Sequence, residues 1–295
     1  MKPAVFDYLR PSTLNEALTF LDEYGYDAKL LAGGQSLIPM MNMRLARPRF
    51  LIDMNRIDEL NYIRIENERI NIGGLTRHFS VEMSPIIEQF SPMLSEGMKL
   101  IGHSQIRSRG TIGGSIVHAD PTAELPVMLT ALEGTVTVVS SEGEREIEPD
   151  DLFLTYLTTT IEPNEILTKV SIPIIQARTG HSIEEFTLRK GDFAIVLAAA
   201  SVTLDEEGAI EKVILCIGGV DGIPVRLDDV TDLMVGLVPN EEMIDEVCSG
   251  IADLLEPEPD IHASADYRKE LSVVMSARVL KKAIVRAKIS ARIGE

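Results

Sequence analysis

The chain has 295 residues, of which 45% are hydrophobic and 25% charged, the composition of an ordinary globular protein with two or three domains. Its 46 acidic residues outnumber 28 basic ones, and the net charge of −18 would repel a nucleic-acid backbone, so small molecules and proteins are the expected partners. The only cysteines, Cys216 and Cys248, stand in no metal-ligand spacing, which excludes a cysteine-ligated iron–sulfur cluster within this chain.

The first unit is predicted over residues 1–56. Thr13-Leu14-Asn15-Glu16 has the pattern of a capping box, and the apolar residues after it keep helical spacing, which predicts a helix. A strand is expected over 29–32, running into Gly33-Gly34-Gln35-Ser36, and a second strand over 50–53. This order predicts a small α/β unit with a glycine pair at the end of a strand.

The second unit is predicted over residues 57–175. Alternating apolar residues indicate a strand over 69–74, and a helix is expected over 81–90 with Ser80 as its N-cap. A second glycine pair falls in a predicted loop over 108–115. A hairpin over 136–147 and a strand over 167–172 complete this unit.

The third unit is predicted over residues 176–295, as a hairpin over 193–217 followed by two helical segments. Twelve acidic and no basic residues lie between Arg226 and Arg268, whereas eight basic residues and one acid follow up to Arg292. The basic segment is expected to be a surface helix with a solvated cationic face, and subunit docking is the alternative. Its predicted buried stripe is Val274, Ala277, Leu280, Ile284 and Ala287.

The two glycine pairs are the candidate binding loops, at residues 32–36 and 111–115. Paired glycines permit positive φ and let a ligand approach the backbone, and successive N–H groups there can form an anion site. The hydroxyls of Ser36, Thr111 and Ser115 could add donors, so the two loops could hold a pyrophosphate from both sides. A Gly-Gly pair can equally be a simple tight turn.

Other motifs are absent from the sequence. No two glycines stand at i and i+2, no glycine precedes a lysine, and Ser115 lacks the G-x-S-x-G context because residue 117 is valine. The five histidines have no metal-ligand spacing, and Cys216 lies in an apolar run that predicts a buried, reduced thiol. Because there is also no signal-peptide core and no long uncharged apolar run, we expect a cytoplasmic protein without a transmembrane segment.

Five segments, in order along the chain, resemble the FAD-binding medium subunit of molybdenum hydroxylases of the xanthine dehydrogenase and carbon monoxide dehydrogenase type. They are Ala32-Gly33-Gly34-Gln35-Ser36-Leu37, Ile106-Arg107 with residues 110–116, residues 118–126, residues 189–194 and residues 265–271. The resemblance implies an α+β protein: two FAD-binding subdomains of the vanillyl-alcohol oxidase (PCMH) type, then a C-terminal α+β domain of the CO dehydrogenase flavoprotein type.

The resemblance also implies which residues lie at a non-covalently bound FAD. Both glycine loops would wrap the pyrophosphate, Glu124 would accept from ribose hydroxyls, Leu167 would meet the adenine side, and the loop with Lys190 would lie near the flavin ring. Gln35 and Ser115 differ from the residues common in relatives. No catalytic residue or metal ligand is implied, and the expected FAD residues are Leu31, Ala32, Gly33, Gly34, Gln35, Ser36, Leu37, Ile101, Thr111, Ile112, Gly113, Gly114, Ser115, His118, Asp120, Glu124, Leu167, Lys190, Asp192 and Phe193.

In complexes of this family, a large subunit oxidises the substrate at a molybdopterin cofactor, a small subunit carries two [2Fe–2S] clusters, and the FAD passes electrons to an external acceptor. The resemblance therefore implies an electron-transfer flavoprotein subunit in a dimer of heterotrimers. The residues leave two alternatives open. One is a freestanding FAD-dependent oxidoreductase with its own substrate, and the other is an FAD-binding module without turnover.

Overall fold

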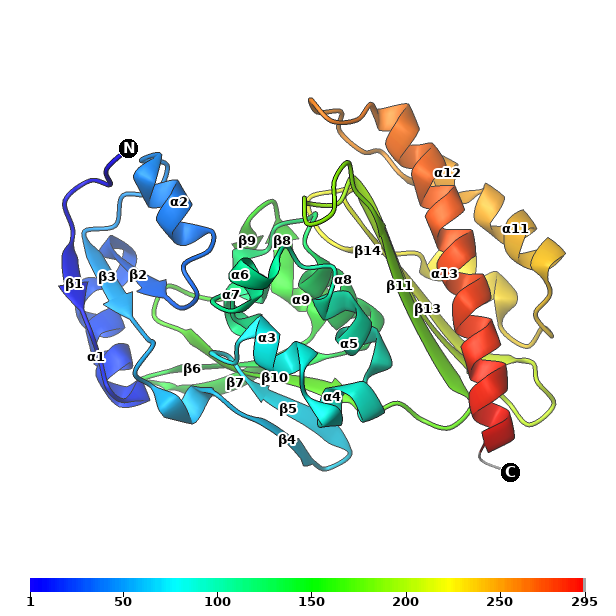
Figure 1. The fold of residues 1–295 in the computed structure, drawn as a ribbon, viewed down its shortest axis with the longest axis horizontal. Coiled ribbons are helices and arrows are strands. Elements are labelled where there is room, and N and C mark those ends of the chain that lie inside the picture. The colour runs from blue at the N-terminus through cyan, green and yellow to red at the C-terminus, as the bar shows by residue number, and fades with distance from the viewer. Residues whose placement is uncertain (294–295) are drawn as a thin grey trace.

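The computed structural model describes residues 1–293 as three α+β units in a row, with the N-terminus at one end and the C-terminal helix at the other (Figure 1). Each unit contains a sheet of its own: β1-β3-β2 in the first, β4-β5-β10-β6-β7 in the second and β11-β12-β13-β14 in the third. A two-stranded sheet, β8-β9, accompanies the second unit. Within residues 1–293, none of the helices has the length and apolar character needed to cross a membrane.

The first unit is a parallel sheet with β3 (Phe50–Asp53) between β1 (Asp7–Leu9) and β2 (Ala28–Leu31). The predicted helix is α1 (Leu14–Tyr24), and the side chain of Thr13 accepts a hydrogen bond from the backbone of Glu16. The carboxylate of Glu16 accepts from the backbone N–H of Ser12 instead of that of Thr13, so the second bond of the predicted capping box is displaced by one residue. The remaining elements are η1 (Gly25–Asp27), α2 (Leu37–Asn42) and, at the boundary, η2 (Asp58–Leu60).

The second unit is an antiparallel five-stranded sheet with helices gathered on one face, between this sheet and the third unit (Figure 1). The predicted hairpin is present as β6 and β7. The strands are β4 (Ile63–Glu66), β5 (Arg69–Gly73), β6 (Thr135–Ser140), β7 (Gly143–Ile147), β8 (Phe153–Thr155), β9 (Thr158–Thr159) and β10 (Ile166–Pro173). The helices are α3 (His78–Glu82), α4 (Pro85–Phe90), α5 (Pro92–Met98), α6 (Ser104–Arg107), α7 (Ile112–His118), α8 (Glu124–Ala131) and α9 (Pro149–Leu152).

The single helix predicted over 81–90 is wrong, because the chain breaks between α3 and α4. Pro85 disfavours helical conformation at the preceding residue but is well suited to the first position of a new helix. Ser84 caps that helix by accepting from the backbone of Ile87, while Ser80, the predicted cap, lies inside α3.

The third unit is an antiparallel sheet whose long strands are buried on both faces. The predicted hairpin is β12 (Val196–Leu204) with β13 (Ile210–Gly218), beginning three residues later than expected. Successive side chains of a strand alternate between faces, so Leu197 and Ala199 join the core of the second unit while Ala198 and Ala200 face the last helix. The strands β11 (Thr179–Phe186) and β14 (Val225–Arg226) were not predicted.

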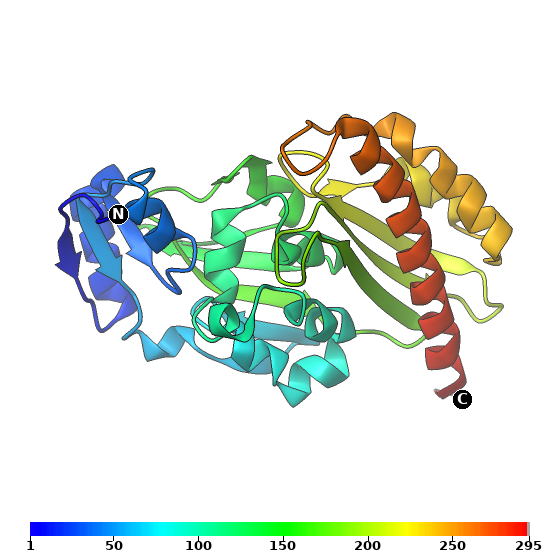
Figure 2. The ribbon, with the colours of Figure 1, turned by 45° about the horizontal axis from the view of Figure 1, so that its top comes forward.

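The last helix, α13 (Ala265–Ile293), lies along the sheet (Figure 2). Leu280, Ile284 and Ala287 are buried as predicted, but Val274 is 44% exposed. At 3.6 residues per turn, Val274 lies about 120° around the helix from Leu280, so one stripe cannot contain both. The helix packs against α11 (Glu241–Ser249). The other elements of this region are α10 (Asp228–Thr231), η3 (Asp232–Met234) and α12 (Ile251–Leu254).

Candidate functional site

The first glycine loop connects β2 to α2 in the first unit. Gly34 has φ of +73°, a left-handed conformation that favours glycine, as predicted for this turn. The side chain of Gln35 donates to the carbonyl of Gly33 at 3.2 Å, so it stabilises the loop from within. Within residues 1–293, the backbone N–H groups of Gly34, Gln35 and Ser36 donate to no protein acceptor. They are therefore available to an anionic ligand.

The second glycine pair does not form the predicted loop. Thr111 is the N-cap of α7, its hydroxyl accepts from the backbone of Gly114 at 3.1 Å, and Gly113 and Gly114 are helical residues without positive φ. The N–H groups of Ile112 and Gly113 donate to the carbonyls of Thr76 and Gly74, each at 3.0 Å. The expectation of positive φ here was wrong, because the capping threonine starts a helix directly.

The glycines of α7 are needed for close packing instead. A Cβ atom on Gly113 would lie 2.7 Å from the carbonyl oxygen of Gly74, and one on Gly114 would lie 2.7 Å from the hydroxyl of Thr111. Ser115, also in α7, is half-buried. Its hydroxyl is the predicted group of this helix that could still form a hydrogen bond with a ligand.

The two glycine segments meet in space. A Cβ atom on Gly33 would lie 2.5 Å from the carbonyl oxygen of Arg109 and 2.8 Å from Cα of Gly110. A Cβ atom on Gly114 would lie 3.7 Å from that of Ala32. The structure therefore brings the first loop and the start of α7 together. The backbone N–H groups of the first loop are free, whereas those at the start of α7 already donate to carbonyl groups. This arrangement fits a phosphate group held mainly by the first loop.

Glu124, the first residue of α8, is only 5% exposed. Burial raises the pKa of its carboxyl group to about 8, and the negative charges of Glu185 and Asp120 act in the same direction. At neutral pH this group is therefore mainly protonated and can donate as well as accept a hydrogen bond. Glu185, which comes from β11 of the third unit, also has a pKa raised to about 7 by burial.

Replacing Glu124 by glutamine is expected to stabilise the flavin-free protein more at pH 8 than at pH 5. Because the pKa of Glu124 is raised in the folded chain, the folded chain keeps a proton that the unfolded chain releases above about pH 4.5. The contribution of Glu124 to the free energy of unfolding therefore falls as the pH rises towards 8. Glutamine does not titrate, and the other titratable groups are the same in both proteins. The pH dependence of the difference in their free energies of unfolding therefore comes from Glu124. Urea unfolding of both proteins across this pH range measures the difference, and a difference independent of pH would contradict it.

The other predicted residues lie around this centre in different environments. Asp120 accepts from the backbone and hydroxyl of Thr122 at 2.9 and 2.6 Å, so its carboxylate closes a local turn. His118 is half-buried at the end of α7. Ile101 and Leu167 are each 7% exposed and belong to the core of the second unit, so they could offer a ligand only an apolar edge.

Lys190, Asp192 and Phe193 lie in the loop between β11 and β12, and all three are exposed. Gly191 has φ of +86°, and a Cβ atom there would collide with the ring of His103, immediately before α6. The loop of the third unit is thus in contact with the second unit. The 60% exposure of Phe193 leaves its ring free to cover a ligand or meet a partner.

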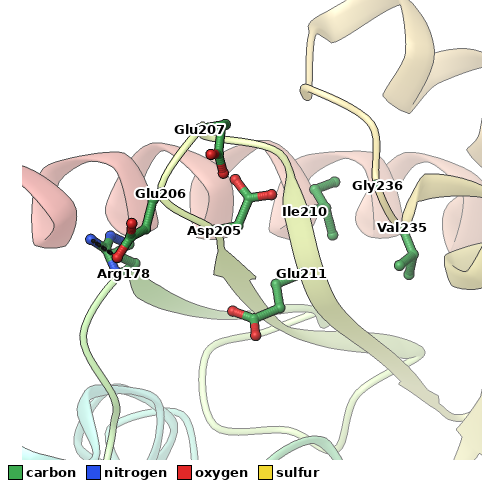
Figure 3. A pocket seen from close by; sticks show the side chains of 8 residues that line it. All are labelled: Arg178, Asp205, Glu206, Glu207, Ile210, Glu211, Val235 and Gly236. Atoms are coloured by element: carbon green, nitrogen blue, oxygen red, sulfur yellow. Dashed lines mark ion pairs between the residues drawn. The ribbon is translucent and has the colours of Figure 1, made fainter.

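A separate hollow of about 520 Å³ lies at the turn between β12 and β13 and contains none of the predicted residues (Figure 3). Four carboxylates line it, and Arg178 pairs with that of Glu206 at 3.5 Å. This negative surface would repel a pyrophosphate. Among residues 1–293, no group of three or more acidic, histidine or cysteine side chains could hold a metal ion, and Cys216 and Cys248 are both buried and unpaired.

Sequence reasoning missed two residues between the glycine segments, Asn55 and Arg77. Their side chains hydrogen-bond each other and the backbone of both segments. The signal for Asn55 was its place two residues after Asp53, at the end of a buried strand and therefore beside the end of β2. Nothing in the sequence marked Arg77, because its partners come from distant parts of the chain.

Comparison with known families matches two family models that together cover most of the chain. The family described as the FAD binding domain in molybdopterin dehydrogenase matches residues 4–175, and the CO dehydrogenase flavoprotein C-terminal domain matches residues 181–283. The chain is 40% identical to subunit alpha of the 6-hydroxypseudooxynicotine dehydrogenase complex of Paenarthrobacter nicotinovorans, covering 98% of this chain and 97% of that protein. It is 33% identical to the carbon monoxide dehydrogenase medium chain of Hydrogenophaga pseudoflava, covering 97% and 99%.

Solved structures have the same fold along nearly the whole chain. Carbon monoxide dehydrogenase from Hydrogenophaga pseudoflava superposes with a TM-score of 0.94 at 34% identity, covering 97% of this chain and 99% of that one. Quinoline 2-oxidoreductase from Pseudomonas putida 86 superposes with a TM-score of 0.92 at 32% identity, covering 99% and 100%. These matches confirm the predicted fold class, an FAD-binding domain followed by a CO dehydrogenase flavoprotein C-terminal domain.

Proposed function

Because the chain belongs to the family of FAD-binding medium subunits of molybdenum hydroxylases, we propose that it transfers electrons from the [2Fe–2S] clusters of a partner subunit to an external acceptor. Its relatives are subunits of dehydrogenase complexes, and the chain is accordingly an oxidoreductase subunit. When bound, FAD supplies a redox centre that can exchange electrons singly or in pairs.

The observation that carries the proposal is the set of free N–H groups on Gly34, Gln35 and Ser36, beside the contact between Gly33 and Arg109. Successive backbone donors at a glycine turn suit a diphosphate without requiring a cationic side chain. The exposed loop with Lys190 and Phe193, from the third unit, would lie towards the flavin end. In this proposal the chain's own residues bind and orient the cofactor and supply no nucleophile.

The partners proposed are an iron–sulfur small subunit and a large subunit with the molybdopterin cofactor, in a dimer of heterotrimers. Two relatives are named as a subunit or medium chain of a multi-subunit enzyme, which supports separate partner chains.

We expect the full-length chain loaded with FAD to be nearly inert towards aldehydes, purines and N-heterocycles, and to be reduced rapidly by its iron–sulfur partner. The measurement is loss of the visible flavin absorbance under anaerobic conditions, first with each organic compound alone and then with the partner in its reduced form. Oxidised partner serves as the control.

Rapid bleaching by an organic compound without a second protein would support a freestanding oxidoreductase instead. Failure of the reduced partner to bleach the flavin would support a binding module without turnover. Either result would replace the electron-transfer proposal.

A further inference from the structure

We propose that Asn55 and Arg77 form a bridge that sets the spacing between the two glycine segments and thereby determines how tightly the chain binds FAD. This inference rests on the proposed FAD site. The amide nitrogen of Asn55 donates to the carbonyl of Ala32 at 3.0 Å, its amide oxygen accepts from the guanidinium of Arg77, and that guanidinium also donates to the carbonyl of Arg109. Two side chains thus join the backbone of the first loop to the backbone just before α7.

The first half of the bridge is itself anchored in the parallel sheet. The carboxylate of Asp53, at the end of β3, accepts from the backbone of Asn55 at 3.0 Å and from its side-chain amide, and the hydroxyl of Tyr8 donates to its other oxygen. Burial raises the pKa of Asp53, but these hydrogen bonds outweigh it and the net pKa is below the ordinary value. The carboxylate of Asp53 therefore stays anionic, and it fixes the orientation of the Asn55 side-chain amide.

The bridge also orients the donors of the first loop. In a trans peptide the carbonyl and the following N–H point in opposite directions, so directing the Ala32 carbonyl to Asn55 directs the N–H of Gly33 away from it. The free N–H groups of Gly34, Gln35 and Ser36 follow directly in the chain. The bridge consequently fixes the peptide that leads into the loop, and the three free N–H groups are the next donors along the chain.

The second half of the bridge acts at the narrowest contact of the site. The carbonyl of Arg109 that accepts from Arg77 is the same atom that would lie 2.5 Å from a Cβ on Gly33. Burial and the neighbouring charge of Arg109 both lower the pKa of Arg77, yet a guanidinium remains charged at any ordinary pH. A cation at this junction favours a diphosphate, and its two bonds from one planar group maintain the spacing.

The test uses the flavin-free, full-length chain titrated with FAD, in the variants Asn55→Leu, Arg77→Met and the double variant. Each single change removes a hydrogen bond to a charged group and is expected to weaken FAD binding about 10- to 100-fold. Because the two side chains act in series, the double variant is expected to be no weaker than the weaker single variant. Arg69→Met is the matched control, since Arg69 donates to the hydroxyl and carbonyl of Ser171 in the same unit, away from the glycine segments.

Melting temperatures of the flavin-free variants separate this role from general stability. Arg77→Lys provides a milder variant, because one ammonium group cannot reproduce the two-pronged contact, and it is also expected to weaken binding. Equal FAD affinity in Arg77→Met and Arg69→Met, or losses that multiply in the double variant, would overturn the bridge. If the wild-type chain itself bound no FAD, the proposed function would fail as well. That result differs from one in which the wild type binds FAD and the Arg77→Met and Arg69→Met variants bind it equally.

Discussion

Replacing Gly33 by alanine is expected to weaken FAD binding at least tenfold, and up to about 100-fold, which corresponds to roughly 1.4–2.8 kcal/mol. Gly33 has no positive φ, so the alanine backbone itself is acceptable, and the effect is purely one of contact. The new methyl group would lie 2.5 Å from the carbonyl oxygen of Arg109 and 2.8 Å from Cα of Gly110. Backbone atoms cannot rotate away, so the first loop and the start of α7 must separate, at a cost of about 1–3 kcal/mol.

Titration of the flavin-free protein with FAD, followed by quenching of flavin fluorescence, measures this loss. Gly250→Ala is the control, because Gly250 has φ of −79° and a Cβ there would have no neighbour within 4 Å. The control is expected to bind FAD like the wild type. Equal affinities for Gly33→Ala and Gly250→Ala would show that the contact between the two segments does not matter for the cofactor.

Replacing Arg268 by methionine is expected to destabilise the chain by about 2–5 kcal/mol, because it leaves two carbonyl groups without their donor. Arg268, in the first turn of α13, is only 5% exposed. Its guanidinium donates to the carbonyls of Ile195 and Gly219, and to the carboxylate of Asp260 at 2.8 Å. It therefore ties the last helix to the residue before β12 and the residue after β13, which lie side by side at one end of the sheet of the third unit.

Urea unfolding followed by circular dichroism measures the destabilisation. Arg278→Met on the same helix removes the same charge, but Arg278 is exposed, and the change is expected to alter stability by less than about 0.5 kcal/mol. If both variants unfolded at the same urea concentration, the hydrogen bonds of Arg268 would contribute nothing measurable. The comparison separates these buried contacts from the general effect of cationic charge on an acidic protein.

Local signals in the sequence were sufficient for many elements. The capping threonine of α1, the hairpins β6–β7 and β12–β13, and the positive φ of Gly34 depend on residues close in the chain, so they could be predicted from it. Local reasoning failed where two local preferences competed. At Ser84-Pro85 the proline divided an apparently continuous helix, and at Thr111 a capping residue converted an expected loop into the first turn of α7.

The ordered motifs in the sequence by themselves determined the family and its cofactor, because the types and order of their residues are specific to that family. Only the tertiary structure decided which donors are free, since the N–H groups of Ile112 and Gly113 are taken by carbonyls from the turn after β5. It also decided that Asn55 and Arg77 join the two glycine segments, and that burial beside Glu185 raises the pKa of Glu124. These properties depend on contacts between residues far apart in the chain, and the spacing of residues along a sequence contains no record of such contacts.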